Sequence, residues 1–507
     1  MRFSNVLSLL ERSAGKYPDK AAFGDVDGDL TFSELERGAK TVGSFLAERI
    51  PENAPVAFYL DKSNIAVTAM LGTIYARGFY SVIDVRSPLP RVEKILNVLE
   101  PAVILTDRKS ASEAEKIKTG TEFFVIEDIL ENNRPDEALL KKVRAEALDI
   151  DPIYVNFTSG STGVPKGVTV AHRSVIDFID CFTELFDINE TDILGNQAPF
   201  DFDVSVKDIY SALYTGAKVQ IIPREYFSVP MQLMDYLADH KVTTLVWAVS
   251  AMCFVSIMNG FDYRVPETVR RVMFSGEVMP VKQLKVWKRF LPDATYVNLY
   301  GPTEITCNCT YYILDRDFED GEVIPAGIPF PNEKVFLLSG EDKLIKEPGE
   351  VGEIVVSGTA VAEGYYNDKE RTEAVFVQNP LQNRFLEPVY RTGDLGKFDA
   401  EGNLIYVSRK DFQIKHMGQR IELGEIEAVA SSAPEVERVC CVYDEAKHRI
   451  LMFYLGKADK KALSAFLREK LPPYMVPNSI KELVSMPLNK NGKIDRRALL
   501  EGKYDPA

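Results

Sequence analysis

One stretch of the chain combines the residue types that bind phosphate groups, and it reads T-S-G-S-T-G-V-P-K-G at residues 158–167. Glycines let backbone N–H groups approach an anion closely, and hydroxyl side chains add further donors. Lys166 adds a positive charge, and the apolar run at residues 153–157 just before the loop is typical of a buried strand. The pattern predicts a strand that leads into a loop holding the β- and γ-phosphates of ATP. The candidate residues are Thr158, Ser159, Gly160, Ser161, Thr162 and Lys166.

This loop differs from the P-loop of many nucleotide-binding proteins, whose pattern is G-x-x-x-x-G-K-[ST]. If Lys166 is the lysine of that pattern, Gly160 fits its first glycine. Pro165, however, stands at the second glycine, and Gly167 replaces the hydroxyl residue that holds magnesium. The P-loop interpretation therefore fails at two fixed positions. For the loop taken alone, a purely structural Ser/Gly turn remains the alternative.

The elements around this loop alternate between short apolar runs and helical patterns over about the first 300 residues. Such alternation predicts βαβ units and a largely parallel sheet. A Ser-x-x-Asp pattern at Ser174 and Asp177 predicts a capping box that opens a further helix. The expected strands lie at residues 56–60, 80–83 and 102–106, and the expected helices at residues 65–75 and 91–99.

The composition of the sequence changes after about residue 324, where prolines and glycines become frequent between short strand-like runs. A second break falls near residues 408–411, and helices are expected beyond it near residues 422–431 and 461–471. The predicted fold class is α/β. It comprises a large N-terminal domain of layered α/β subdomains, a β-rich subdomain, and a small α+β C-terminal domain.

Composition excludes several functional classes. The formal net charge of −15 argues against a nucleic-acid-binding protein, whose footprint is a basic face. The six cysteines have no zinc-site spacing, which favours reduced thiols in a cytoplasmic protein. The uncharged stretch at residues 245–258 is shorter than the roughly 17–25 residues of a membrane-spanning helix. We therefore expect no membrane insertion, and we interpret this stretch as a buried strand followed by a buried helix.

Six further motifs follow the loop in a fixed order, and together with it they carry a family resemblance. They are F-D-V-S at residues 202–205, N-L-Y-G-P-T-E at 298–304, Y-R-T-G-D-L at 390–395, R-K-D-F-Q-I-K at 409–415, G-Q-R-I-E-L-G-E-I-E at 418–427 and N-G-K-I-D at 491–495. In these motifs the chain resembles the adenylate-forming superfamily over nearly its whole length. Within that superfamily it resembles the amino-acid adenylation domains of nonribosomal peptide synthetases and the related D-alanine–carrier-protein ligases.

The resemblance implies a reaction in two steps. The carboxylate of an amino acid attacks the α-phosphorus of ATP to give an aminoacyl-adenylate and pyrophosphate. The aminoacyl group then passes to the phosphopantetheine thiol of a carrier protein. The resemblance also implies a large adenylating domain at residues 1–408, a hinge at 409–411 centred on Asp411, and a mobile C-terminal domain at 412–507. Because we recognise no carrier segment before Ala507, we expect the carrier protein to be a separate chain.

The resemblance further implies an adenosine clamp formed by three motifs. Tyr300 would stack on adenine, and Asn298 would lie near the edge of the base. Gly301 belongs to the same motif and to the same nucleotide site. Asp394 would accept hydrogen bonds from the ribose hydroxyls, with Arg409 beside them.

Phosphate chemistry in this reaction brings two anions together, so catalysis depends on positioning and on charge neutralisation. The resemblance implies that Thr303 contacts phosphate and that Glu304 holds Mg²⁺, a hard cation that prefers carboxylate oxygen. Lys493 would reach the α-phosphate and the substrate carboxylate as a mobile point charge.

The amino-acid pocket is also implied by the resemblance. Asp203 matches the aspartate that binds the α-ammonium group of the substrate, which favours an amino acid over an aryl or fatty acid. Lys207 is the unusual pocket residue, because a buried ammonium group needs a partner. It pairs with a polar or acidic substrate side chain, or it snorkels out to solvent. The remaining pocket residues are Val204, Val246, Met273, Ser275, Leu299, Cys307 and Asn308.

Lys207 and Ser275 both depart from what a D-alanine ligase suggests, so the substrate stays open between D-alanine and a polar or acidic amino acid. Two other functions remain as alternatives. An acyl-CoA ligase is disfavoured by Asp203 and by the motif at residues 409–415. A non-catalytic binding protein on the same scaffold is disfavoured because Lys166, Glu304 and Lys493 are all present.

The role of Lys493 makes a first testable prediction. We expect Lys493→Ala to lose nearly all adenylate formation, because the charge at the α-phosphate is removed. The variant should still transfer the aminoacyl group from preformed adenylate. Single-turnover assays of the two half-reactions measure this difference, and full adenylation by the variant would disprove the assignment.

Overall fold

The strands at the centre of the protein are short apolar runs that are buried along their whole length. In the computed structural model, which describes residues 4–160, 164–410, 413–488 and 494–506, β3 (Pro55–Tyr59) and β4 (Phe79–Ile83) are buried at every position. This is the pattern of parallel strands that are covered by helices on both faces. The expected strands at 56–60 and 80–83 are therefore confirmed.

Two large sheets with parallel centres form the N-terminal part of the molecule. The first has the order β19-β8-β7-β4-β3-β5-β6, and the second has the order β15-β14-β13-β12-β11-β9-β10-β1-β2. The other strands of the first sheet are β5 (Val103–Thr106), β6 (Phe123–Val125), β7 (Pro152–Thr158), β8 (Lys166–Ala171) and β19 (Gly364–Tyr365). Those of the second are β1 (Ala21–Asp25), β2 (Gly28–Thr31), β9 (Ile193–Asn196), β10 (Lys218–Ile221), β11 (Thr244–Ala248), β12 (Arg271–Ser275), β13 (Thr295–Tyr300), β14 (Thr310–Ile313) and β15 (Ile328–Pro329).

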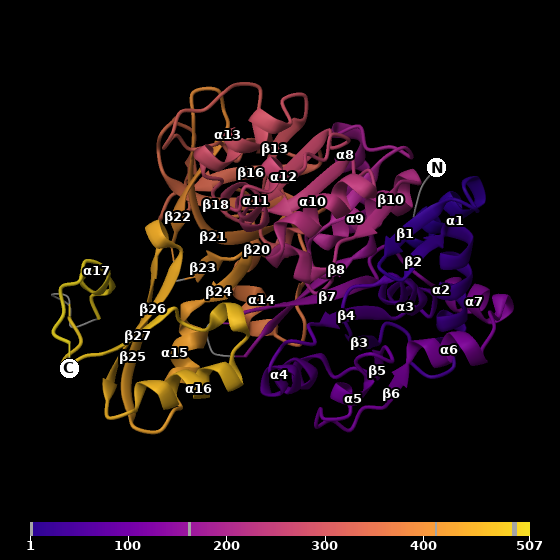
Figure 1. Ribbon diagram of the computed structural model, residues 1–507, viewed down its shortest axis with the longest axis horizontal. Coiled ribbons are helices and arrows are strands. Elements are labelled where there is room, and N and C mark those ends of the chain that lie inside the picture. Colours follow the sequence, from indigo (N-terminus) through magenta and orange to yellow (C-terminus); the bar gives the residue numbers. More distant parts are fainter. Residues whose placement is uncertain (1–3, 161–163, 411–412, 489–493, 507) are drawn as a thin grey trace.

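A third, antiparallel sheet and a small C-terminal α+β domain complete the chain (Figure 1). The third sheet has the order β17-β16-β18-β21-β20, with β22 paired to β21. Its strands are β16 (Glu333–Leu338), β17 (Leu344–Ile345), β18 (Gly352–Gly358), β20 (Phe376–Gln378), β21 (Pro388–Phe398) and β22 (Leu404–Arg409). The C-terminal domain contains β23 (Gln413–His416), β24 (Gln419–Glu422), β25 (Val436–Asp444), β26 (Arg449–Gly456) and β27 (Ser479–Glu482). The fold class and the β-rich portion after residue 324 are confirmed.

Helices cover the sheets, and most of the helices expected from the sequence are present at the expected places. The helices expected at 65–75, 91–99, 422–431 and 461–471 are α3, α4, α15 and α16. The stretch at 245–258 is strand β11 followed by the buried helix α11, as expected. The helices are α1 (Leu7–Lys16), α2 (Phe32–Ala47), α3 (Asn64–Tyr75), α4 (Leu89–Leu99), α5 (Ala111–Ala114), α6 (Ile126–Asn132), α7 (Glu137–Arg144), α8 (His172–Leu185), α9 (Ser205–Thr215), α10 (Pro230–Asp239), α11 (Val249–Ile257), α12 (Gly260–Tyr263), α13 (Val281–Phe290), α14 (Lys369–Val375), α15 (Leu423–Ser431), α16 (Lys460–Lys470) and α17 (Arg496–Leu500).

One local prediction was wrong. The capping box expected at Ser174 and Asp177 does not open a helix, because α8 already begins at His172 and Ala171 is its N-cap. Ser174 lies inside the first turn and is buried. The strand β8 runs directly into this helix, so the chain enters α8 earlier than the side-chain pattern indicated.

No helix among the described residues is long and apolar enough to cross a membrane.

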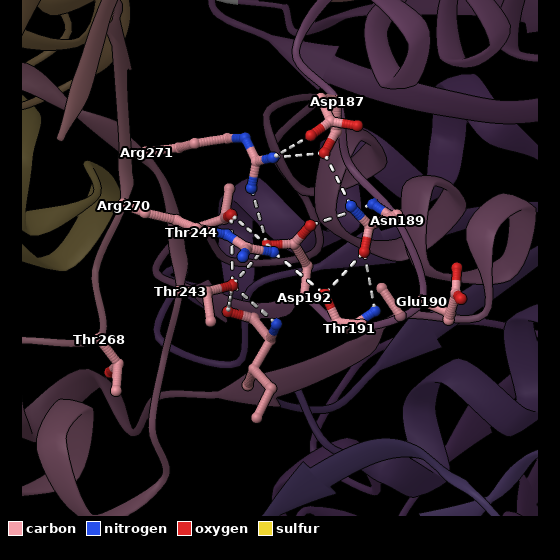
Figure 2. Close-up of polar contacts among 12 residues, drawn as sticks. Asp187, Asn189, Glu190, Thr191, Asp192, Thr243, Thr244, Thr268, Arg270 and Arg271 are labelled. Carbon is pink, nitrogen blue, oxygen red and sulfur yellow. Dashed lines mark hydrogen bonds and ion pairs between the residues drawn. The ribbon is translucent and has the colours of Figure 1, made fainter.

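One buried carboxylate, that of Asp192, accepts hydrogen bonds from residues at the starts of neighbouring strands of the second sheet (Figure 2). Asp192 is almost fully buried, and its Oδ1 accepts hydrogen bonds from Thr243 at 2.6 Å and from Arg271 at 2.9 Å. Arg270 and Thr244 donate to the same oxygen. These partners come from the starts of β11 and β12. Asp192 therefore links neighbouring parallel strands at the end of the sheet where those strands begin.

Replacing this carboxylate tests its contribution. We expect Asp192→Asn to lower the free energy of unfolding by about 3 kcal/mol, the lower end of the cost of breaking a buried ion pair, because the largely buried Arg271 guanidinium loses its buried counter-ion and keeps only the exposed carboxylate of Asp187. Urea denaturation followed by tryptophan fluorescence measures the effect on this sheet, since Trp247 on β11 and Trp287 on α13 are the two tryptophans of the chain. Asp320→Asn is the matched control. It removes an exposed ion pair with Lys285 and should cost less than about 1 kcal/mol. Equal losses in the two variants would contradict the assignment.

Candidate active site

The site is built around the carboxylate of Glu304, which follows β13 in a short 3₁₀ turn and is fully buried. Tyr365 donates a hydrogen bond to its Oε1 at 2.8 Å, and Lys166 Nζ lies 3.3 Å from the same oxygen. Arg420 donates to Oε2 at 2.6 Å. Burial alone would raise the pKa of Glu304, but the Arg420 guanidinium and the Lys166 ammonium hold it well below its usual range. The carboxylate therefore stays ionised.

The loop predicted to bind phosphate joins two antiparallel strands, because Thr158 of β7 pairs with Lys166 of β8. Glycine is required at position 160 because there is no room for a side chain: a Cβ there would lie 2.0 Å from the carbonyl oxygen of Val164. Ser159 is buried, and its hydroxyl donates to the carbonyl oxygen of Arg420 at 2.7 Å. The loop thus contacts the C-terminal domain directly. Two candidate residues of the loop, Ser161 and Thr162, lie outside the described residues.

The residues expected around adenosine are also brought together. Tyr300 donates its phenolic hydrogen to Asp394 Oδ2 at 2.6 Å, and Arg409 donates to Asp394 Oδ1 at 2.6 Å. Register explains the second contact, since Asp394 of β21 is paired with Arg409 of β22. Asn298 donates to the carbonyl oxygen of Pro325 at 2.7 Å, which fixes its side chain.

Gly301 lies at the turn that follows Tyr300. A Cβ at this position would lie 2.5 Å from the Cα of Asn308 and 2.8 Å from the carbonyl oxygen of Cys307. Glycine therefore allows the chain after β13 to pass close to two residues of the expected amino-acid pocket. In this way Gly301 connects the nucleotide side of the site to the pocket.

The residues expected to form the amino-acid pocket are all buried. Asp203 precedes α9, and Cys307 donates through its thiol to the carbonyl oxygen of Asp203 at 3.0 Å. Burial raises the pKa of Asp203, while a hydrogen bond with Thr303 and the charge of Lys207 act in the opposite direction. The other walls are supplied by Val204 before α9, Val246 of β11, Met273 and Ser275 of β12, and Leu299 of β13.

Lys207 does not snorkel to solvent, so that alternative was wrong. Its side chain is fully buried on the first turn of α9, and Nζ donates to Asn308 Oδ1 at 2.6 Å. Burial lowers the pKa of Lys207, and the carboxylate of Asp203 acts against this. The ammonium group is held inside the pocket by a neutral amide, because the short turn after β13 brings Asn308 next to α9.

Sequence reasoning assigned no role to Lys415, Arg420 or Tyr365, which complete the site. The hairpin β23–β24 places Lys415 Nζ 5.5 Å from the centre of the Tyr300 ring and Arg420 on Glu304. Gly418 at its turn donates its backbone N–H to Glu277 at 3.2 Å. Both cations belong to motifs that carried the resemblance, and that was the available signal. No such signal pointed to Tyr365, because it belongs to none of the motifs that carried the resemblance.

A second contact between the domains is a buried ion pair of Arg91 on α4 with Glu425 on α15. Both side chains are nearly inaccessible to solvent. In Figure 1 the C-terminal domain lies beside α4 and the first sheet. A cavity of about 30 Å³ remains between the domains, and its lining includes Arg91, Ser159, Asp203 and Arg420.

Glu304 suits a divalent cation of the kind that accompanies a nucleotide. Mg²⁺ in such sites takes one or two carboxylates, and the substrate phosphates and water supply the other ligands. A single carboxylate beside a phosphate loop fits that ligand arrangement. No cluster of three or more potential metal-ligating residues occurs among residues 4–160, 164–410, 413–488 and 494–506. The expected catalytic residue Lys493 and the expected hinge residue Asp411 lie outside the described part of the chain.

Comparison with known families gives two matches. The model described as AMP-binding enzyme matches residues 10–366, and the model described as AMP-binding enzyme C-terminal domain matches residues 425–493. The two matches together include the phosphate loop, Glu304, the pocket residues and, as the last matched position, Lys493.

Among individual relatives, the L-proline--[L-prolyl-carrier protein] ligase of Streptomyces coelicolor is 30% identical over 98% of this chain and 96% of its own. The D-alanine--D-alanyl carrier protein ligase of Bacillus licheniformis is 29% identical over 98% of this chain and 99% of its own. Larger synthases also match, and the chain spans 6% to 45% of the length of five of them. The solved structure of holo-PA1221, an NRPS protein with adenylation and PCP domains, shares the fold with a TM-score of 0.86, 24% identity, and coverage of 98% of this chain and 84% of that one.

The Arg91–Glu425 ion pair makes a prediction about the contact between the domains. We expect Glu425→Gln to weaken this contact by about 3–5 kcal/mol, because Arg91 is left as an uncompensated buried charge. Hydrogen exchange should then speed up in β24 and in α4, and it should not change in the second large sheet. Unchanged exchange in β24 would show that the ion pair does not hold the domains together.

Proposed function

Because the chain belongs to the AMP-binding enzyme family, we propose that it activates an amino acid with ATP and passes it to a thiol. The products of the first step are an aminoacyl-adenylate and pyrophosphate. The acceptor of the second step is the phosphopantetheine thiol of a carrier protein. The observation that carries this proposal is the buried carboxylate of Asp203, which lines a cavity together with Ser159 of the phosphate loop and Thr303.

We assign the nucleotide to the face that carries Tyr300, Asp394 and Glu304. Asp394 is already fixed by hydrogen bonds from Tyr300 and Arg409, so its carboxylate is oriented to accept from a ribose. Tyr300 offers its ring to adenine. Asn298 and Gly301 shape the edge of that pocket.

We assign the triphosphate to the loop at residues 158–167, with Thr303 beside it. Bound to Glu304, Mg²⁺ would neutralise the charge of the phosphates and make pyrophosphate a better leaving group. Lys166 contributes a second positive charge on the same side. Lys493 approaches the α-phosphate from the C-terminal domain, and its ammonium group neutralises the charge that the attacking carboxylate brings.

The chemistry of the pocket supports a polar or acidic amino acid. Asp203 pairs with the α-ammonium group of the substrate, and this pairing restores the counter-ion that a buried carboxylate needs. Lys207 and the amide of Asn308 are then the polar groups that remain for the substrate side chain. A carboxylate or amide oxygen would accept from Lys207, whereas the methyl group of D-alanine would leave both groups without a substrate partner.

The carrier protein is the proposed acceptor because two full-length relatives are named as carrier-protein ligases. We propose a large domain at residues 1–408, a hinge at 409–411 that pivots at Asp411, and a moving domain at 412–507. The alternative acceptor is free coenzyme A. Assays with preformed adenylate and either a phosphopantetheinylated carrier protein or coenzyme A separate the two acceptors.

The substrate is tested by amino-acid-dependent exchange of pyrophosphate into ATP, across the twenty standard amino acids and D-alanine. We expect the strongest exchange with an amino acid whose side chain accepts a hydrogen bond. For that substrate, Lys207→Leu should lower kcat/KM by about 10- to 100-fold, since a hydrogen bond to a charged group is worth about 1.5–3 kcal/mol. The KM for ATP should not change.

Met273→Leu is the control for this experiment, because it conserves the volume of a residue in the same pocket. It should keep the preference of the parent enzyme. Strongest exchange with D-alanine would refute the role of Lys207. Exchange with no amino acid would refute the role of Asp203 and the proposed function with it.

A further inference from the structure

The hairpin β23–β24 places a cation on the carboxylate that we assign to the metal. Arg420 projects from β24 and reaches Glu304 Oε2 at 2.6 Å, while Tyr365 and Lys166 contact Oε1. Both oxygens of Glu304 are therefore engaged by groups of the chain itself. A divalent cation binds through an oxygen lone pair, so it and the Arg420 guanidinium compete for Oε2.

The same strand also contacts the phosphate loop. The backbone N–H of Glu422 donates to Ser159 Oγ at 3.0 Å, and that hydroxyl donates to the carbonyl oxygen of Arg420 at 2.7 Å. Ser159 therefore has both its donor and an acceptor position used by β24. One strand thus occupies the two groups that serve the metal and the phosphates.

Physical chemistry requires some cation at this position. Glu304 is fully buried, and an isolated carboxylate in such a place is costly to maintain. Lys166 alone lies at 3.3 Å from one oxygen. The second cation on the carboxylate is Arg420 in this structure.

We propose that Arg420 is a built-in counter-ion that replaces the divalent metal on Glu304, so that metal binding and the docked position of β24 exclude each other. This inference rests on the proposed function. On this proposal, the metal would leave together with pyrophosphate after the first step, and Glu304 would then be free to bind Arg420. Arg420 is thus a positioning residue: it holds the C-terminal domain in the docked arrangement after the first step is complete.

The proposal has a reciprocal consequence. If docking of Arg420 disfavours the metal, then the metal disfavours docking by the same factor. Coupling between sites in proteins commonly amounts to about 5- to 150-fold in affinity. Removing Arg420 should therefore tighten metal binding, because the metal no longer has to displace the guanidinium.

Metal affinity is measured directly with Mn²⁺ as the probe, by electron paramagnetic resonance, in the presence of a non-hydrolysable ATP analogue and without any amino acid. We expect Arg420→Gln to bind Mn²⁺ at least about 5-fold more tightly than the parent protein. Arg420→Lys keeps the charge but not the planar guanidinium group, so it should lie between the two. Equal or weaker Mn²⁺ binding by Arg420→Gln would overturn the proposal.

Arg496→Gln is the matched control. It also removes an arginine–glutamate contact in the C-terminal domain, that of Arg496 with Glu427 at 2.6 Å, but both residues of this contact belong to the C-terminal domain. Its Mn²⁺ affinity should equal that of the parent. Circular dichroism of each variant establishes that it is folded. If Arg420→Gln does not fold, the result for Arg420→Lys decides, and a Mn²⁺ affinity of Arg420→Lys equal to that of the parent counts against the proposal.

A second readout separates a positioning role from a general loss of structure. Fluorescence energy transfer between dyes on the two domains should report docking in the parent and a shift away from it when Mn²⁺ and the ATP analogue are added. In Arg420→Gln the docked signal should already be weaker than in the parent before any addition. Neither the Mn²⁺ measurement nor the energy-transfer measurement needs an amino acid, so both can give the expected result even when pyrophosphate exchange fails. Failure of the proposed function and failure of the Arg420 proposal can therefore be told apart.

Discussion

A buried carboxylate that must always have a cation is the constraint on which the rest of the site depends. Glu304 lies below the phosphate loop with no exposed surface, and its pKa is held low by Arg420 and Lys166. Those two cations come from different domains and contact different oxygens of the carboxylate. The position of the C-terminal domain is therefore tied to the electrostatics of one side chain in the large domain.

The fold brings the residues of the site together from distant parts of the chain. The two large sheets contribute Lys166 and the turn after β13, the third sheet contributes Asp394, and the C-terminal hairpin contributes Lys415 and Arg420. The ion pair of Arg91 with Glu425 closes the same interface at its far side. Residues of the site thus occupy the region where all these units meet, and this is where a reaction that needs two anions to approach can obtain several positive charges.

Much of the fold was accessible from the sequence because its signals are local. Apolar runs with helical or strand spacing gave the central strands and the helices α3, α4, α15 and α16 to within a few residues. Tertiary context overrode the Ser174 signal, since β8 leads straight into α8. The ordered motifs located Glu304, Asp394 and Asp203, but they could not show which residues touch. That Arg420 contacts Glu304, or that Asn308 holds Lys207 inside the pocket, depends on the packing of segments about a hundred residues apart.

The central claim is that a carboxylate attacks the α-phosphorus of ATP in this site. The most direct test uses the preferred amino acid labelled with ¹⁸O in its carboxylate, together with ATP, Mg²⁺ and hydroxylamine as a small acceptor. Cleavage of the acyl–oxygen bond leaves one carboxylate oxygen on the phosphate, so mass spectrometry should find one ¹⁸O in the AMP that is released. Unlabelled AMP, or ADP in place of AMP, would contradict the account.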